Sequence, residues 1–359
     1  MKIVGIQSNV VVVPLEIPIV SAVRQADTVA LILIAVQTDG GIVGHSYVQA
    51  FGVDQARAIQ SLIAYLGGVL DGEDPLLILR CYQIMDRANN LLGRGGVATF
   101  ALSGIDMALW DIAGKAYGAP VAALLGAAGT RVTVYQSAGL WLSAPDEVAR
   151  QAGEFKDAGH TAMKMRLGRP FPGDDVEAVH LVREAVGNDT LLMADANQAW
   201  TPHRAITVAR VLEQFGLYWL EEPVDHDDID GQALVAREVT TQIATGENAY
   251  LPQGFRALVE ARAADILMPD LQRVGGITGW MRVAAIAEAW KLPIASHLFP
   301  ELSVHVMAAS STAVLLEYMP WAQPLMAEKL EIEDGFVSVP MRPGLGLVFD
   351  EVAIARYAV

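Results

Sequence analysis

Cysteine is almost absent from this 359-residue chain, which contains only Cys81. A single cysteine cannot form an intrachain disulfide, so the fold must be stabilised by its hydrophobic core. The absence of disulfides is typical of proteins in a reducing compartment. Cys81 lies in the apolar run LLILRCYQIM, where a free cysteine behaves as a small hydrophobic side chain. We therefore expect Cys81 to be an ordinary core residue and the protein to be cytoplasmic.

Basic charge is also scarce. Lys and Arg number 25 against 41 Asp and Glu, which gives a formal net charge of −16. The basic residues are scattered, so the sequence indicates no face that would bind nucleic acid or an anionic membrane. No uncharged apolar stretch reaches the ~18 residues of a membrane span. The N-terminal MKIVGIQSNVVVV is typical of a strand, because a signal peptide needs a longer apolar block and a small-residue cleavage site.

Hydrophobic residues make up 53% of the chain, which is enough for a large core. A single domain rarely exceeds ~250–300 residues, so we predict two. Residues 1–126 have a mixed pattern that predicts an α+β domain. Strands are expected within 1–15 and 28–48, with a hairpin signal at Asp39-Gly40-Gly41. Apolar periodicity predicts helices over 54–66, 76–89 and 97–117.

Short apolar runs alternate with helical stretches after Gly126-Ala127-Ala128-Gly129. They recur at roughly 20–31 residues, the period of a strand–helix unit. Eight such runs predict a parallel (β/α)8-type barrel rather than an open sheet. The runs are RVTVYQS, TAMKMR, TLLMADAN, LYWLEEP, TQIATGEN, ADILMPD, LPIASH and TAVLLE.

Ionisable side chains end the second to eighth of these runs. In this class of barrel, catalytic groups lie at the C-terminal ends of the strands and converge on one mouth. One acid at a strand end is most simply a solvated turn residue, but seven successive ends with ionisable groups indicate a functional site. The residues are Lys164, Arg166, Asp195, Asn197, Glu221, Glu247, Asp270, His297 and Glu317.

Three carboxylates on successive strands, Asp195, Glu221 and Glu247, would place three negative charges close together. Such a cluster is unfavourable unless a cation neutralises it. Oxygen-only donors favour Mg²⁺, with Mn²⁺ as the alternative. Asn197 lies two residues beyond Asp195 and so on the same strand face, where it can donate to a substrate oxygen.

An acid–base pair is expected where Asp270 and His297 end neighbouring strands. The aspartate would fix the imidazole tautomer and raise its basicity, so that His297 could remove a carbon-bound proton. Lys164 and Arg166 share one strand face across the mouth, where two cations would lower the pKa of the lysine and bind a substrate carboxylate. A protonated or strongly hydrogen-bonded Glu317 could donate to that carboxylate as charge builds on it, with a structural ion pair as the alternative interpretation.

Several longer motifs occur in a particular order along nearly the whole chain. They are ALSGIDMALWDIAGKAYGAPVAALLG, MADANQAW, WLEEPV, GEN, MPDLQRVGGITGW and SHLFPELSVH. Together they resemble the enolase superfamily and, within it, the mandelate racemase subgroup. The resemblance implies a modified (β/α)7β barrel over residues 127–329, with an N-terminal α+β capping domain over 1–126 that about 330–359 completes.

The same resemblance implies roles for individual residues. The substrate would be a small carboxylate whose α-proton is removed to form a metal-stabilised enediolate, as in enolase-superfamily sites generally. It also implies a homo-oligomer, an octamer or a dimer. The implied roles are metal ligation by Asp195, Glu221 and Glu247, a base at His297 assisted by Asp270, a general acid at Glu317, and carboxylate binding by Lys164 and Asn197.

One position departs from the subgroup, whose Lys-x-Lys motif is here Lys164-Met165-Arg166. Arginine is not appreciably deprotonated in proteins, so Arg166 is a poor base. Racemisation takes a proton from one face and returns it on the other, whereas dehydration needs one base. We therefore predict that His297 drives dehydration of a sugar-acid-like substrate to a 2-keto acid. The alternatives are a racemase or epimerase of a 2-hydroxy acid, and a catalytically silent metal-binding scaffold.

Cap loops should close over the mouth and select the substrate. The candidates are Val20–Asp27, which contains Arg24, and Ser46–Val53, which contains Phe51. Arg24 favours a polar distal group on the substrate, while Phe51 favours an apolar one, and both alternatives stay open. Apolar walls are expected from Trp141, Trp200, Leu298 and Phe299.

Overall fold

The computed structural model describes all residues from 1 to 359. Its N-terminal part is an antiparallel sheet of β1 (Ile3–Val20), β2 (Gln25–Thr38) and β3 (Val43–Ala50), in that order. The expected hairpin at Asp39–Gly41 is confirmed and joins β2 to β3. One prediction was wrong, because most of the supposed loop 46–53 is strand: Ser46–Ala50 pairs with β2.

Helices cover one side of this sheet. They are α1 (Val53–Val69), α2 (Ile78–Ala88), α3 (Val97–Tyr117) and the short α4 (Val121–Leu124), so all three predicted helices are confirmed. Close approach of β3 to α3 depends on glycine, since a Cβ at Gly44 would lie 2.2 Å from the carbonyl oxygen of Ala108. Only α3 is long and apolar enough to cross a membrane by length and composition, and 83% of its most apolar window is buried inside the protein, as in a core helix.

Eight parallel strands form the barrel that the apolar runs predicted. It closes through pairing of the eighth strand with the first, for example Leu316 with Val134. The strands are β4 (Arg131–Gln136), β5 (Ala162–Arg166), β6 (Leu191–Asp195), β7 (Leu220–Glu221), β8 (Ile243–Thr245), β9 (Ile266–Leu267), β10 (Ile294–Ala295) and β11 (Ala313–Tyr318).

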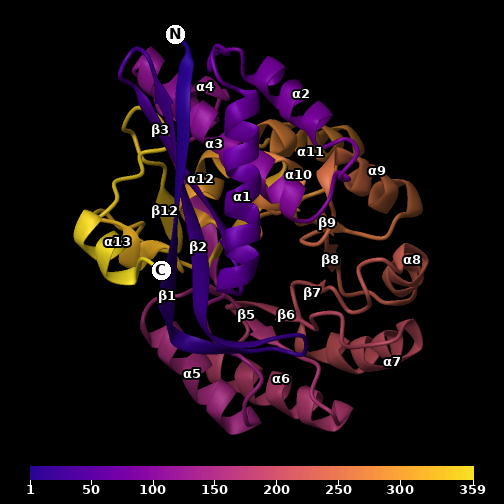
Figure 1. Ribbon diagram of the computed structural model, residues 1–359. Coiled ribbons are helices and arrows are strands. Elements are labelled where there is room, and N and C mark those ends of the chain that lie inside the picture. Colours follow the sequence, from indigo (N-terminus) through magenta and orange to yellow (C-terminus); the bar gives the residue numbers. More distant parts are fainter.

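Helical connections link these strands on the outside of the barrel (Figure 1). No barrel helix follows β11, so the architecture is the expected (β/α)7β barrel. Several of these helices begin with a proline in their first turn, where its missing N–H costs nothing. They are α5 (Pro145–Asp157), α6 (Pro172–Val186), α7 (Pro202–Leu212), α8 (Ile229–Glu238), α9 (Leu251–Ala261), α10 (Leu271–Val274), α11 (Gly276–Trp290) and α12 (Pro300–Ala308), with a 3₁₀ turn at Glu213–Phe215.

The last part of the chain returns to the N-terminal sheet. After a 3₁₀ turn at Gln323–Leu325, β12 (Phe336–Ser338) runs antiparallel to β4, and α13 (Glu351–Tyr357) ends the chain. Ala358 then bridges to Val11 of β1, so the C-terminus lies beside β1 (Figure 1). The domain limits near residues 126 and 330 stay a prediction.

The tip of the β1–β2 hairpin reaches across to the barrel (Figure 1). Leu142, in the loop after β4, donates its N–H to the carbonyl oxygen of Val20 at 2.8 Å. A Cβ at Gly168, in the loop after β5, would lie 3.0 Å from the Cβ of Ala22. The hairpin tip therefore covers the strand ends at which the predicted site residues lie.

Candidate active site

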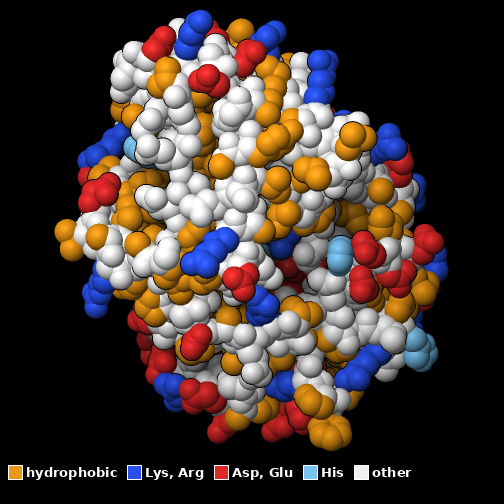
Figure 2. Space-filling view, viewed as in Figure 1, with side chains coloured by type: hydrophobic (Ala, Val, Ile, Leu, Met, Phe, Trp, Pro, Cys, Tyr) orange, Lys and Arg blue, Asp and Glu red, His pale blue; other side chains and the backbone are white.

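A cavity of about 300 Å³ lies between the cap and the C-terminal ends of the barrel strands. Figure 2 shows a hollow near the centre of this face, with acidic and basic side chains at its floor. Charged residues from five barrel strand ends meet here, as the strand-end pattern predicted. The lining residues used below are Arg24, Gln49, Phe51, Trp141, Lys164, Arg166, Asp195, Asn197, Glu247, Arg273, His297, Leu298, Glu317, Met319 and Trp321.

The three predicted metal ligands come together. One carboxylate oxygen from each of Asp195, Glu221 and Glu247 lies within 4.8 Å of the other two. Burial raises the pKa of Glu221 to about 8, since attraction by Lys164 offsets only part of that cost. Burial likewise raises the pKa of Asp195. An oxygen-only donor set that is unfavourably charged by itself fits a hard divalent cation.

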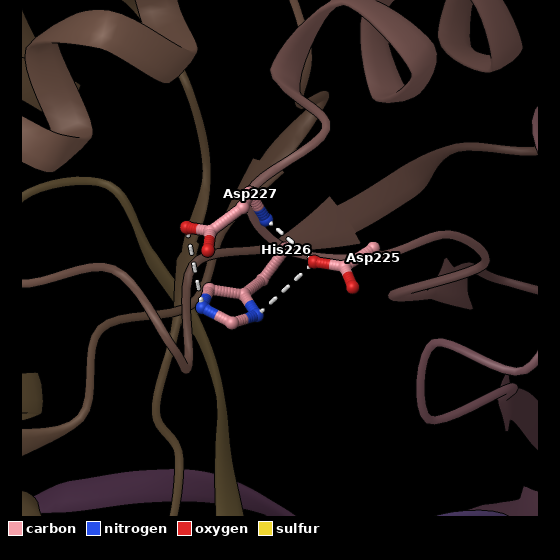
Figure 3. A group of neighbouring side chains, drawn as sticks. All are labelled: Asp225, His226 and Asp227. Atoms are coloured by element: carbon pink, nitrogen blue, oxygen red, sulfur yellow. Dashed lines mark hydrogen bonds and ion pairs between the residues drawn. The ribbon is translucent and has the colours of Figure 1, made fainter.

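A second acidic group is much more exposed to solvent than the three predicted metal ligands. Asp225, His226 and Asp227 are consecutive residues in the loop after β7. The two carboxylates lie within ion-pair distance of the two nitrogens of the imidazole (Figure 3). The side chains of Asp225 and Asp227 are 69% and 91% exposed, so water already solvates their charge. Only the buried group at the barrel mouth has a charge that a cation must balance.

Lys164 is the counter-charge inside the carboxylate cluster. Its Nζ lies 2.5 Å from Oε1 of Glu221 and 3.0 Å from Oε1 of Glu317, and the side chain is buried. Burial and the neighbouring Arg166 both lower the pKa of Lys164, but the carboxylates of Glu221 and Glu317 raise it more. The expected lowering by Arg166 is therefore real but outweighed, and Lys164 is a positively charged donor.

Arg166 lies beside Asp195, with 3.4 Å between Nε and Oδ2. Its guanidinium stacks on Trp141 at 4.6 Å, and Nη2 donates to Oγ of Ser137 at 3.1 Å. Nε and Nη1 are buried without a hydrogen-bond partner. Buried donors of this kind are costly unless a ligand accepts them, so Arg166 is prepared to bind an oxygen-rich substrate.

His297 and Asp270 form the predicted pair. Nδ1 of His297 lies 2.7 Å from Oδ2 of Asp270, so Nδ1 carries the proton and donates this hydrogen bond. Nε2, on the other side of the ring, lies 3.3 Å from Oε2 of Glu247. Burial alone would lower the pKa of His297, but Glu247 and the hydrogen bond to Asp270 raise it to about 9. The free Nε2 faces the carboxylate cluster and the cavity.

Glu317 is held on both oxygens. Oε1 accepts from Oγ of Ser137, and Oε2 accepts from the N–H of Leu298, each at 2.7 Å. Burial would raise the pKa of Glu317, but Lys164, His297 and Arg166 hold it below the usual range. Glu317 is thus an ionised, firmly hydrogen-bonded carboxylate that also forms the ion pair considered for it from sequence.

Asn197 lines the cavity as expected, but from the turn after β6 rather than from the strand, and its amide nitrogen donates to Asp195 instead of to a ligand. Its backbone N–H and Nδ2 both donate to Asp195, at 2.8 and 3.0 Å. Oδ1 is buried without a partner and can accept a hydrogen bond from a ligand. Asn197 has a φ of 42°, a left-handed conformation that asparagine tolerates.

The cap places Arg24 and Phe51 over the cavity together. The Arg24 guanidinium lies 4.4 Å from the centre of the Phe51 ring, and Phe51 meets Trp321 edge-on at 6.1 Å. Trp141 and Leu298 form part of the wall, as predicted. The prediction was wrong for Trp200 and Phe299, which pack into the hydrophobic core; Met319 and Trp321 line the cavity instead.

Sequence reasoning missed several polar residues in and around this site, among them Ser137, Arg273 and Glu222. Ser137 links Arg166 to Glu317, and it ends the one strand run to which no site residue was assigned. Arg273 donates from Nη1 to Oδ2 of Asp270 at 3.1 Å, and its spacing of three residues along a helix could have indicated the pair. Glu222 is fully buried and accepts from Gln198 and Asn248 behind the metal ligands; the doubled acid in WLEEP was its only signal.

Comparison with known families matches both parts of the chain. Residues 5–126 match the mandelate racemase / muconate lactonizing enzyme N-terminal domain, and residues 147–353 match the enolase C-terminal domain-like family. Between them, these matches span the cap and most of the barrel.

Individual relatives resemble the chain over nearly its full length. It is 36% identical to an L-talarate/galactarate dehydratase of Salmonella typhimurium, over 90% of this chain and 82% of that protein. An enolase from Bradyrhizobium complexed with magnesium and mandelic acid superposes with a TM-score of 0.94 at 36% identity, covering 100% of this chain and 98% of that one. A racemase from Streptomyces coelicolor with bound magnesium also gives 0.94, at 34% identity, with 99% and 100% coverage. The chain is therefore a member of the enolase superfamily, in its mandelate racemase / muconate lactonizing enzyme family.

Proposed function

We propose that the chain catalyses the Mg²⁺-dependent dehydration of a hydroxy-carboxylate of the sugar-acid type to a 2-keto acid. The observation that carries the proposal is the asymmetry of the mouth. A pair able to take a proton, Asp270 and His297, lies on one side. On the other side of the mouth, Arg166 takes the position of the subgroup's second lysine. Arginine keeps its proton and so does not act readily as a second base. The dehydratase relative supports the same class of substrate.

The metal would be held by Asp195, Glu221 and Glu247, whose burial and mutual repulsion favour a bound cation. Mn²⁺ would fit the same oxygen donors. When bound, the cation supplies stabilisation of the negative charge that develops on the substrate carboxylate.

His297 would remove the α-proton. Its Nδ1 donates to Asp270, so in neutral His297 the lone pair is on Nε2, the atom that faces the cavity. The same Nε2 can return that proton to the departing β-hydroxyl, which leaves as water. The α-hydroxyl remains on the resulting enol, so one base accounts for both proton transfers of the elimination. The enol then tautomerises to the 2-keto acid by losing its hydroxyl proton to solvent and taking up a proton at the β-carbon.

Positioning of the substrate would fall to groups with free hydrogen-bonding capacity. Lys164 can donate to the carboxylate, while Nε and Nη1 of Arg166 and Oδ1 of Asn197 can bind hydroxyl groups. Glu317 would become a general acid only after taking a proton, and its Ser137 and Leu298 bonds hold it in place for a carboxylate oxygen. Arg24, Phe51 and Leu298 would bind the distal part of the substrate.

A racemase or epimerase is the second candidate, favoured by the similarity to a protein that binds mandelic acid, which has no β-hydroxyl. Incubation of candidate acids with the enzyme and Mg²⁺ in D₂O separates the two. A 2-keto acid trapped with semicarbazide supports dehydration. Recovery of a stereochemically scrambled acid with deuterium at the α-carbon would instead support racemisation and overturn the proposal.

A catalytically silent metal-binding scaffold is the third candidate. The Asp270–His297 pair argues against it, since a scaffold has no need of a histidine whose Nδ1 is fixed by an aspartate while the ring lines the cavity. No turnover across a broad acid library, together with unchanged stability of His297→Asn, would favour the scaffold.

We also infer a homo-oligomer, octamer or dimer, in the cytoplasm. Leu91 and Leu92, in the loop before α3, have side chains that are 98% and 67% exposed, which is unfavourable on a free surface. Sedimentation of the protein and of Leu91→Ser tests this inference, which fails if both are monomers.

A further inference from the structure

Strand β3 is one of the two edge strands of the cap sheet, and residues on it form hydrogen bonds with the barrel. Edge strands have N–H groups without a sheet partner that must be satisfied elsewhere. At one end, His45 donates its N–H to Oδ2 of Asp111, within the cap. Further along the strand, the N–H of Gln49 and the side-chain hydroxyl of Tyr47 bond instead to the barrel.

The first of these bonds leads to Asp270. The N–H of Gln49 donates to Oε1 of Gln272 at 3.0 Å, and Gln272 donates its own N–H to Oδ1 of Asp270 at 2.8 Å. Ser103 of α3 adds a bond to the carbonyl oxygen of Gln272 at 2.9 Å. Gln272 is buried, so these bonds are shielded from competition by water. The cap thus holds one of the two residues that, besides His297, donate hydrogen bonds to the Asp270 carboxylate; the other is Arg273.

The second bond leads to the turn after His297. The hydroxyl of Tyr47 donates to Oε2 of Glu301 at 2.6 Å, with both side chains buried. The Tyr47 ring also packs on Phe299, with 5.5 Å between ring centres. Leu298 and Phe299 have φ values of 54° and 52°, a strained conformation that neighbouring contacts must maintain.

We propose that β3 is a brace that positions the acid–base pair, with Tyr47 and Gln272 as its positioning residues. One bond from the strand leads to Gln272, beside Asp270. The other leads to Glu301 in the first turn of α12, directly after the His297 turn, so the strand contacts the segments that carry both residues of the pair. Neither Tyr47 nor Gln272 lines the cavity, so each acts on the base without contacting substrate. The cap would therefore set the rate of proton removal as well as cover the substrate.

This inference rests on the proposed role of His297, and its test compares Tyr47→Phe with Ser46→Ala. The Ser46 hydroxyl donates to the carbonyl oxygen of Gly104 at 2.6 Å, so its loss removes an equally buried bond within the cap. We expect Tyr47→Phe to lower kcat about tenfold to a hundredfold while KM changes less than about twofold, because misplacing a base costs rate and not binding. Ser46→Ala should leave both constants near wild type.

Two further variants test the bond itself. Glu301→Gln keeps an acceptor for the Tyr47 hydroxyl and should retain most of the rate. Combined with Tyr47→Phe it should add no further loss, since residues that act through one bond are not additive. The proposed role of β3 as a brace is wrong if Tyr47→Phe lowers kcat no more than Ser46→Ala does. It is also wrong if KM rises by as large a factor as kcat falls.

Hydrogen exchange separates this failure from failure of the proposed function. Peptides that cover residues 296–301 should exchange faster in Tyr47→Phe than in wild type or Ser46→Ala, whether or not a substrate is known. A wild-type enzyme that turns over no acid would refute the proposed function. The hydrogen-exchange rates of residues 296–301 would then still show whether β3 acts as a brace. An active wild type with unchanged exchange and rate in Tyr47→Phe would refute the brace alone.

Discussion

Arg166 and Asp195 lie on neighbouring barrel strands with only 3.4 Å between Nε and Oδ2, so a fixed positive charge adjoins a predicted metal ligand. At this position the cation cannot give up its proton, although it stands across the mouth from His297. An arginine at this position therefore leaves His297 without a second base on the opposite side of the mouth.

Arg166→Lys tests whether this position decides the reaction. Unlike arginine, a lysine can lose its proton and act as a base on the face opposite His297, although Asp195 beside it would raise its pKa. We expect the variant to gain α-carbon racemisation of mandelate-like acids, measured by polarimetry or by deuterium uptake in D₂O. Arg169→Lys, in which the arginine pairs with Asp175 outside the cavity, is the matched control and should gain none.

Glu221→Gln should abolish activity and weaken metal binding by at least about a hundredfold, since even groups that merely support a ligand cost 10–100-fold. Titration calorimetry with Mn²⁺ measures the affinity. Glu260→Gln, a surface residue paired only with Arg256, should behave as wild type. Full activity of EDTA-treated wild-type enzyme would contradict a metal-dependent reaction.

Asp270→Asn should lower kcat by about 10³–10⁴-fold, because the amide can present a donor to Nδ1 and favour the wrong imidazole tautomer. Metal affinity should stay unchanged, as Asp270 is not among the three ligands. The rate of α-proton exchange, measured by NMR, checks the expected loss of catalysis. Titration with Mn²⁺ checks that metal affinity is unchanged. Equal losses of activity and metal affinity would point to a general collapse of the site.

Arg24→Gln should raise KM for a dicarboxylic sugar acid more than for its monocarboxylic counterpart. Arg24 makes no ion pair, and its Nε is buried without a partner, so its charge is available to a distal anion. The ratio of the two KM values is the measurement. A uniform change for both acids would indicate that Arg24 only packs on Phe51.

His305 should make the fold less stable in acid. Its Nδ1 accepts from the N–H of Ala122, and Nε2 donates to the carbonyl oxygen of Leu345, so the buried ring is satisfied only when neutral. Burial lowers the pKa of His305 to about 4, below the ~6.5 of an unfolded chain. The unfolded state therefore takes up the proton first, and stability falls as pH drops from 6.5 toward 4.

The expected loss is roughly 2–3 kcal/mol over that range. Urea unfolding in EDTA at several pH values, for wild type and His305→Gln, isolates this contribution as the difference between two curves. The glutamine can make both hydrogen bonds and does not titrate, so the variant should lack that part of the acid sensitivity. Parallel curves would show that His305 is not responsible.

The sequence predicted the barrel and its floor well, because both depend on local signals. A strand–helix period identifies the barrel, and a strand end fixes which side chains reach the mouth, as for Glu221 and His297. Asp39–Gly41 was found for the same reason, since a tight turn has a local composition.

Contacts between distant segments were beyond such signals. Ser137 matters through Arg166 and Glu317, which lie on other strands, and nothing in its own neighbourhood shows this. Trp200 was misplaced because an aromatic residue near a strand end can turn toward either the mouth or the helices. The pKa of Lys164 went against expectation because two acids from other strands outweigh its near neighbour Arg166.

Each strand end contributes its own group to the mouth, on a backbone held by the barrel rather than by the neighbouring group. A substitution at one end therefore replaces one chemical function and leaves the others in place. Proton removal, charge stabilisation and substrate choice can vary independently, so a change as small as lysine to arginine could redirect the chemistry of an inherited site without rebuilding it.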